Sequence, residues 1–102
     1  MIDELDPMHP GEVLEELYLK PLGMSPGALA KALDVPRTRI ERVARGQTSM
    51  SSDTACRLAK AFGTTPSYWM NMQTNYDLAL AARSVDVSHI RRIEGLNPAA
   101  GR

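Results

Sequence analysis

Two helices joined by a tight turn can be read directly from residues 25–45, SPGALAKALDVPRTRIERVAR. Ser25 has a side chain that caps helix N-termini, and the proline after it is pre-organised for the first helical position. Asp34 interrupts the helical pattern and tolerates the left-handed backbone of a turn better than most residues do. Pro36 then starts a second helix, which stops at Gly46. Apolar side chains with helical spacing are expected to be buried: Leu29, Ala30, Leu33, Val35, Ile40 and Val43. This spacing predicts a helix-turn-helix.

The opposite side of the second helix is polar and carries the candidate functional residues. In a helix-turn-helix, the amino-terminal half of the second helix enters the major groove of duplex DNA. Arginine can donate two hydrogen bonds to guanine, and threonine can contact the methyl group of thymine. We therefore expect Arg37, Thr38 and Arg42 to contact base edges. Arg39 is expected to contact either a base or a phosphate.

Residues that flank these helices are candidates for contacts to the DNA backbone. Ser25 and the first amides of its helix can bind a phosphate, because a helix N-terminus attracts anions. The residues that follow the second helix are also expected to contact the backbone: Arg45, Gln47, Thr48 and Ser49. The alternative is that four arginines within nine residues, 37–45, form only a solvated helix face.

Further helices are expected on both sides of this pair. The first helix opens at His9, a helix-start residue, and ends at Pro21 and Gly23. Its apolar residues are Val13, Leu14, Leu17 and Tyr18. The fourth helix is capped by Ser52 and ends at Gly63. Its apolar stripe consists of Ala55, Leu58, Ala59 and Phe62.

A fifth, longer helix opens at Thr65 and Pro66. Its apolar stripe consists of Trp69, Met72, Tyr76 and Leu80, with Trp69 expected in the core. Because no segment alternates between polar and apolar residues, the sequence predicts an all-α fold. Residues 88–94 are expected to form a short helix capped by Ser88, and residues 97–102 a loose tail. We therefore divide the chain into two parts: a DNA-binding domain at 1–83, which includes an acidic N-terminal leader, and a C-terminal extension at 84–102.

The charge distribution is uneven although the net charge of the 102 residues is zero. Residues 1–20 carry a net charge of −5, whereas residues 25–62 carry +4. Such asymmetry separates a face that can bind a polyanion from an acidic one.

Composition argues against several other classes of protein. Cys56, the one cysteine, permits no intrachain disulfide, fits a reducing cytoplasm and is expected to be packed in the fourth helix. No apolar run approaches the roughly 20 residues of a membrane span, and the acidic N-terminus does not resemble a signal peptide. Two histidines and one cysteine give no metal site, and no phosphate-binding loop or catalytic triad is present. We therefore expect a cytoplasmic protein that is not an enzyme and needs no cofactor.

Longer segments of the sequence resemble one family. Residues 9–14 (HPGEVL) and 19–25 (LKPLGMS) are similar to the opening of the HigA antitoxins, also called VapI-like, of the Xre/Cro-like helix-turn-helix class. Residues 53–63 (DTACRLAKAFG) resemble the fourth helix of that family, and residues 65–73 (TPSYWMNMQ) resemble its fifth helix. The resemblance covers roughly residues 8–83.

The resemblance implies a compact five-helix domain like that of the lambda repressor, and the function of a type II antitoxin. Such proteins neutralise a HigB toxin, a small RelE-like ribonuclease, and repress their own operon as homodimers on a palindromic operator. The acidic N-terminus is a candidate contact for a basic toxin. The helix after Trp69 and residues 88–94 are candidates for the dimer interface.

One departure from the family keeps two alternatives open. The family usually has basic residues after Gly46, where this chain has Gln47 and Thr48, so phosphate contacts are expected to be fewer. The first alternative is a stand-alone Xre-type repressor without a toxin. The second is an interaction module that binds a toxin and has weak DNA binding.

Overall fold

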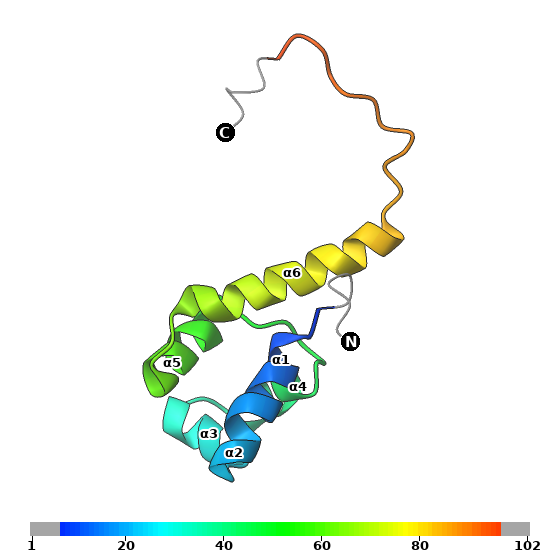
Figure 1. Cartoon of the computed structure of the whole chain (residues 1–102). Coiled ribbons are helices and arrows are strands. Elements are labelled where there is room, and N and C mark those ends of the chain that lie inside the picture. Colours follow the sequence, from blue (N-terminus) through cyan, green and yellow to red (C-terminus); the bar gives the residue numbers. More distant parts are fainter. Residues whose placement is uncertain (1–6, 97–102) are drawn as a thin grey trace.

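The computed structural model describes residues 7–96, which form helices and connecting segments without any strand. The elements are α1 (Pro10–Val13), η1 (Leu14–Leu19), α2 (Lys20–Leu22), α3 (Pro26–Leu33), α4 (Arg37–Ala44), α5 (Ser52–Phe62) and α6 (Pro66–Ser84). Because α1, η1 and α2 follow one another as a continuous rod, the predicted all-α fold of five helices is confirmed (Figure 1). No helix within residues 7–96 combines the length and the hydropathy that crossing a membrane requires.

The rod formed by α1, η1 and α2 departs from regular α-helical geometry at its centre. The backbone N–H of Lys20 donates to the carbonyl of Glu15, so the segment Leu14–Leu19 is π-helical. The wider turn changes which side chains face inward, and the buried leucines Leu14 and Leu19 are five residues apart. Leu17, which was expected to face inward at α-helical spacing, is 63% exposed. That prediction was wrong because the π turn shifts the register.

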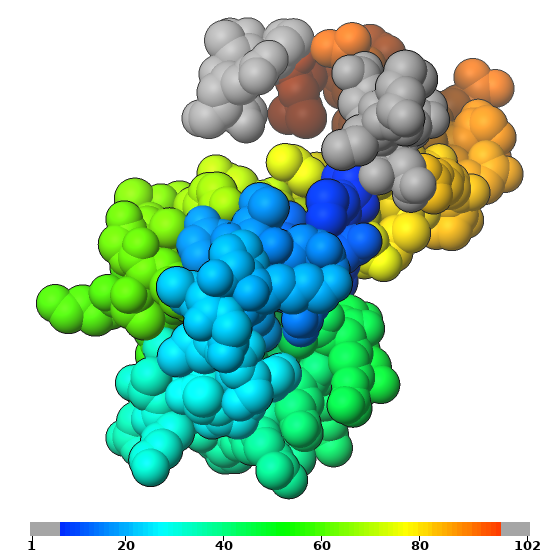
Figure 2. All heavy atoms as spheres, turned by 60° about the horizontal axis from the view of Figure 1, so that its bottom comes forward, coloured from blue at the N-terminus to red at the C-terminus, as the bar shows by residue number. Residues whose placement is uncertain are grey.

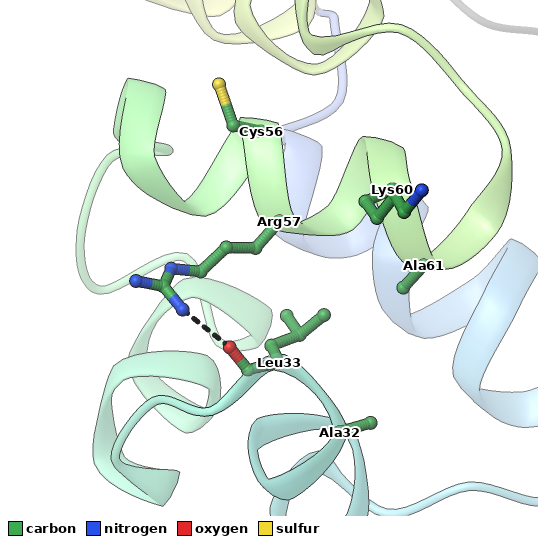
Figure 3. Close-up of a pocket in the computed structure, with 6 residues that line it drawn as sticks. All are labelled: Ala32, Leu33, Cys56, Arg57, Lys60 and Ala61. Atoms are coloured by element: carbon green, nitrogen blue, oxygen red, sulfur yellow. Dashed lines mark hydrogen bonds between the residues drawn. The ribbon is translucent and has the colours of Figure 1, made fainter.

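The turn between α3 and α4 forms as its sequence predicts. The Oγ of Ser25 accepts a hydrogen bond from the amide of Ala28 at 3.0 Å. Asp34 ends α3 in the left-handed conformation, with φ of 60°. A residue of α5 also caps this turn, because Nη1 of Arg57 donates to the carbonyl oxygen of Leu33 at 2.8 Å (Figure 3). This hydrogen bond from α5 helps to hold the turn that sets the position of α4 relative to α3.

Two predictions for α5, its N-cap and the burial of Cys56, were wrong. Its N-cap is Ser51 rather than Ser52, since the Oγ of Ser51 accepts from the amide of Thr54 at 3.2 Å. Cys56, expected to be packed, is exposed beside a hollow between α3 and α5 (Figure 3). The buried side of α5 includes Ala55, and the next residue points about 100° away from it around the helix.

Trp69, near the start of α6, is fully buried, which confirms its predicted place in the core. Its indole Nε1 donates to Oγ1 of Thr64 at 2.8 Å, so the polar atom of this large side chain has a partner. The ring of Tyr18 packs against it at an angle of 51°, with centroids 5.1 Å apart, and the centroids of Tyr18 and Phe62 are 4.8 Å apart. These aromatic rings join the first rod to α5 and α6.

The second half of α6 extends beyond the other helices (Figure 1). Trp69 and Gln73 are buried, and Met72 and Tyr76 are half-buried. Leu80, predicted to continue this stripe, is 45% exposed because the helical body has ended before that position.

After Ser84 the chain leaves α6 as an irregular segment, and every residue from 85 to 96 is exposed. The short helix predicted at 88–94 is absent, so that prediction was wrong. The Oδ1 of Asp86 accepts from both the amide and the hydroxyl of Ser88, at 3.0 and 2.7 Å. Ser88 therefore closes a local turn instead of capping a helix. The predicted acidic leader at 1–6 and tail at 97–102 lie outside the described residues.

Candidate nucleic-acid interface

The helix α4 has a buried side and an exposed side. Ile40 and Val43 are 0% and 2% exposed and pack into the core. Four of the predicted contact residues are exposed on and just after this helix: Arg37, Thr38, Arg42 and Arg45. In Figure 2, the atoms of α3 (cyan) and of α4 with the loop after it (green) form one continuous surface. The polar side of α4 is therefore accessible, as its sequence predicts.

Arg37 of α4 and Ser25, the N-cap of α3, both lie close to Gly27. A Cβ atom placed on Gly27 would be 3.0 Å from Cδ of Arg37 and 3.9 Å from Oγ of Ser25. The absence of a side chain at Gly27 thus allows Arg37 to lie against the N-terminus of α3. The Nε of Arg37 is also 3.5 Å from Oε2 of Glu41, in an exposed pair that contributes little in water.

Arg39 is held by a carboxylate from another helix, whereas the partner of Arg37 lies on α4 itself. The Nη1 of Arg39 donates to Oδ1 of Asp53 at 2.7 Å, and the same oxygen accepts from Nε of Arg57 at 2.8 Å. The hydrogen bonds from Arg57 and from Arg39 lower the pKa of the Asp53 carboxyl. Because Arg57 also caps the carbonyl of Leu33, this series of contacts links α4, α5 and the turn after α3.

Arg42 and Arg45 form no ion pair with any other residue of 7–96. The carboxylate on the same helix, Glu41, is paired with Arg37. A phosphate or a base edge could therefore bind the guanidinium groups of Arg42 and Arg45 without displacing an internal partner.

The loop after α4 is fixed at both ends. Gly46 has φ of 70°, and the amide of Gln47 donates to the carbonyl of Arg42 at 2.8 Å, which closes the helix. At the other end, the amide of Met50 donates to Oε1 of Gln73 at 2.6 Å. Between these ends, the predicted backbone contacts are all exposed: Gln47, Thr48 and Ser49.

Sequence reasoning missed the role of two buried polar residues beside this loop. Gln73 is 4% exposed, and its Nε2 donates to Oδ1 of Asp77 at 2.9 Å while its oxygen binds Met50. The available signal was its place one turn after Trp69 on the inward side of α6. His9 is 7% exposed, and its Nδ1 accepts from the amide of Gly11 at 2.8 Å. This bond confirms His9 as a helix-start residue, but no spacing pattern indicates its contact with the loop.

Comparison with known proteins places this geometry among DNA-binding folds. Residues 16–69 match the helix-turn-helix family. Virulence-associated protein I of Dichelobacter nodosus is 51% identical over 79 residues, which is 78% of this chain and 73% of that protein. The structure of the antitoxin GraA in complex with its operator has a TM-score of 0.83 and 34% identity, covering 93% of this chain and 99% of that chain.

A second solved structure is the Pseudomonas aeruginosa antitoxin HigA with the higBA promoter. It has a TM-score of 0.78 and 38% identity, and covers 89% of this chain and 99% of that chain. In sequence and in fold, the similarity extends well beyond the two helices of the motif. The chain belongs to the helix-turn-helix family, within the HigA- and VapI-like group of its Xre class.

Proposed function

We propose that this protein is a type II antitoxin that represses its own operon by binding operator DNA through α4. The observation that carries this proposal is the exposed polar side of α4, where the guanidinium groups of Arg42 and Arg45 form no ion pair within residues 7–96. Support comes from GraA and HigA, whose structures with an operator and a promoter share this fold.

In the proposed complex, the amino-terminal half of α4 lies in the major groove. Arg37, Thr38 and Arg42 then face base edges. The residues on both sides of the helix contact phosphates: Ser25, Arg45, Gln47, Thr48 and Ser49. Arg39 is a candidate for a phosphate contact, because its half-exposed pair with Asp53 is easily exchanged.

Replacing Arg42 tests this docking. We expect Arg42→Ala to weaken binding to a duplex from the upstream region of the gene by about 1–3 kcal/mol, the value of a bidentate base contact. The control is Lys60→Ala, an exposed cation of α5 outside the proposed interfaces, which should bind like the wild type. Equal operator affinity of Arg42→Ala and wild type in a titration would contradict the docking.

The salt dependence of binding separates this function from a pure interaction module. Phosphate contacts release counterions, so the logarithm of the affinity should fall linearly with the logarithm of the salt concentration. If the protein does not bind the upstream duplex, or if its binding does not respond to salt, only the toxin-binding alternative remains.

The proposed partner protein is a HigB-like toxin, a RelE-like ribonuclease. Membership of the HigA-like group supports this partner, and so does the charge of −5 over residues 1–20. Glu12 and Glu16 are exposed on the first rod, where a basic ribonuclease could contact them. Co-expression with the product of the neighbouring gene should restore growth and yield a co-purifying complex. Operator binding without such a toxic partner would identify a stand-alone repressor.

We further propose that the protein binds DNA as a homodimer, since such motifs read two half-sites about 34 Å apart. The surface that fits this role is the second half of α6 with the extension, which exposes apolar side chains. They are Leu78, Leu80, Val85, Val87, Ile90, Ile93 and Leu96.

A further inference from the structure

We propose that His9 is a positioning residue for DNA binding, whose ring holds the loop of residues 46–49 against α1 and α6. This inference rests on the proposed binding of operator DNA through α4 and the loop after it. It assigns a function in recognition to a residue that lies outside the helix-turn-helix.

The two ring nitrogens of His9 have different partners. Nδ1 accepts a hydrogen bond from the amide of Gly11 at 2.8 Å, so this nitrogen carries no proton. The remaining nitrogen, Nε2, is then the donor, and His9 makes a hydrogen bond to the backbone of Thr48. A single neutral ring thus caps the first rod and binds the middle of the loop.

Packing fixes the ring in this orientation. The ring of Tyr76, from α6, meets His9 nearly edge-on, with centroids 5.1 Å apart and an interplanar angle of 79°. Gly46 passes close to the ring, because a Cβ placed there would be 3.8 Å from Cγ of His9. The loop therefore lies against a ring that α1 and α6 hold from two other sides.

The backbone of α1 also meets the end of α4 directly. A Cβ placed on Gly11 would overlap the carbonyl oxygen of Val43, so a side chain at this position would push the two helices apart. The turn formed by residues 9–11 therefore touches both the last turn of α4 and the loop that follows it. A displacement of this turn would move the proposed phosphate contacts relative to the groove.

Charged groups around the ring come from each element packed against it. Glu12 of α1 and Arg45 at the end of α4 line the same hollow as His9, and Asp77 lies on α6. Burial lowers the pKa of His9, and the bond to Thr48, Asp77 and Glu12 offset this only in part. The neutral ring, which the hydrogen bond from the amide of Gly11 to Nδ1 requires, is therefore the form that the fold favours.

Two substitutions separate the two hydrogen bonds of His9. Asparagine places an amide oxygen near the position of Nδ1 and is among the best N-caps, but it is too short to reach Thr48. Glutamine places an amide N–H near the position of Nε2 and caps poorly. We expect His9→Asn to keep the stability of the helix start but to lose the contact that holds the loop at Thr48. We expect His9→Gln to keep the contact with the loop but to weaken the helix start.

The readout is binding to a duplex of about 30 base pairs from the upstream region, long enough for two half-sites. We expect His9→Asn to bind about tenfold more weakly, with a salt slope shallower by about one, as for one lost phosphate contact. His9→Gln should bind within about twofold of the wild type, which is a smaller change in affinity than the loss of a phosphate contact would cause. The control is Ser67→Asn, an exposed neutral position near the start of α6 and outside the proposed interfaces, which should change neither quantity.

Amide hydrogen exchange without DNA tests the loop itself. The amides of Gln47, Thr48 and Ser49 should exchange faster in His9→Asn than in the wild type, and His9→Gln should restore protection. Unchanged affinity or unchanged exchange in a folded His9→Asn overturns the proposal. If His9→Asn does not fold, a tenfold loss of affinity in His9→Gln overturns it and near-normal affinity supports it. If the wild type itself does not bind the upstream duplex, the proposed function fails, and the exchange data alone decide whether His9 holds the loop.

Discussion

The helical body and the C-terminal extension contain similar apolar residues, but these residues meet opposite surroundings. In the body, Trp69, Leu14 and Ile40 are fully buried, and no buried side-chain nitrogen or oxygen of residues 7–96 lacks a hydrogen-bond partner. In the extension, Ile90 and Ile93 are 64% and 77% exposed. The difference shows that apolar side chains form a core only where a second surface covers them. The homodimer proposed above would supply such a second surface for the extension.

The largest difference between the two regions should appear in stability. We expect Trp69→Ala to lower the free energy of unfolding by about 3–5 kcal/mol, because it leaves a large cavity in the core. At a protein concentration at which the chain is monomeric, the matched change Ile93→Ala should alter it by less than about 0.5 kcal/mol, since the side chain is exposed on its own chain. Urea unfolding followed by circular dichroism measures both. A large loss in Ile93→Ala would show that the extension packs on its own chain.

Self-association should be lost when charge is placed on the extension. The double substitution Leu78→Glu and Ile93→Glu is expected to give a monomer of unchanged helical content. Its operator affinity should fall about a hundredfold, because two linked half-site contacts become independent. Light scattering and titration with the upstream duplex measure the two effects. The control is Leu22→Glu, a 61% exposed leucine on the first rod. A dimer that survives the double substitution would place the interface elsewhere.

A smaller contrast should appear between two serines that make local hydrogen bonds. Ser51 caps α5, so Ser51→Ala should cost about 1 kcal/mol of stability. Ser88 closes an exposed turn with Asp86, so Ser88→Ala should change the unfolding midpoint very little. Thermal unfolding of both variants checks this. Equal losses would mean that the turn at Ser88 belongs to the cooperative fold.

The smallest effect we expect is a pH dependence of the body that comes from His9. Burial holds the pKa of His9 below its ordinary value of 6.5, so near this pH the unfolded chain binds more protons than the folded one. The resulting stability is present above the unfolded pKa and is lost as the pH falls toward the folded pKa. Unfolding measured between about pH 5 and 7 should lose this slope in His9→Asn and keep it in Ser67→Asn. The same slope in His9→Asn and wild type would contradict this origin.

Local signals in the sequence predicted the helices well because their chemistry lies within a few residues. The cap at Ser25, the left-handed turn at Asp34 and the start of α6 after Thr65 were all confirmed. The failures arose where neighbouring residues offered equal choices, as with Ser51 and Ser52, or where backbone geometry changed, as at Leu17. For Ser88, a local turn competed with the helix and no tertiary surface favoured the helix.

The candidate site was less predictable than the fold. The exposed arginines follow from the spacing of Ile40 and Val43 on α4, so sequence was sufficient for them. The contact between Arg39 and Asp53 joins different helices, and His9 and Thr48 are far apart in sequence. No spacing rule brings such pairs together, because their proximity depends on how the helices pack.

A π-helical turn is equivalent to an α-helix that has gained one residue. Deleting one residue between Leu14 and Leu19 would return these two leucines to the spacing of a regular helix without moving the core. A deletion elsewhere in a helix would turn every later side chain by about 100°. Homologous chains that are one residue shorter are thus expected to have the deletion within this segment. The outward-facing Leu17 is the residue that such a chain could lack.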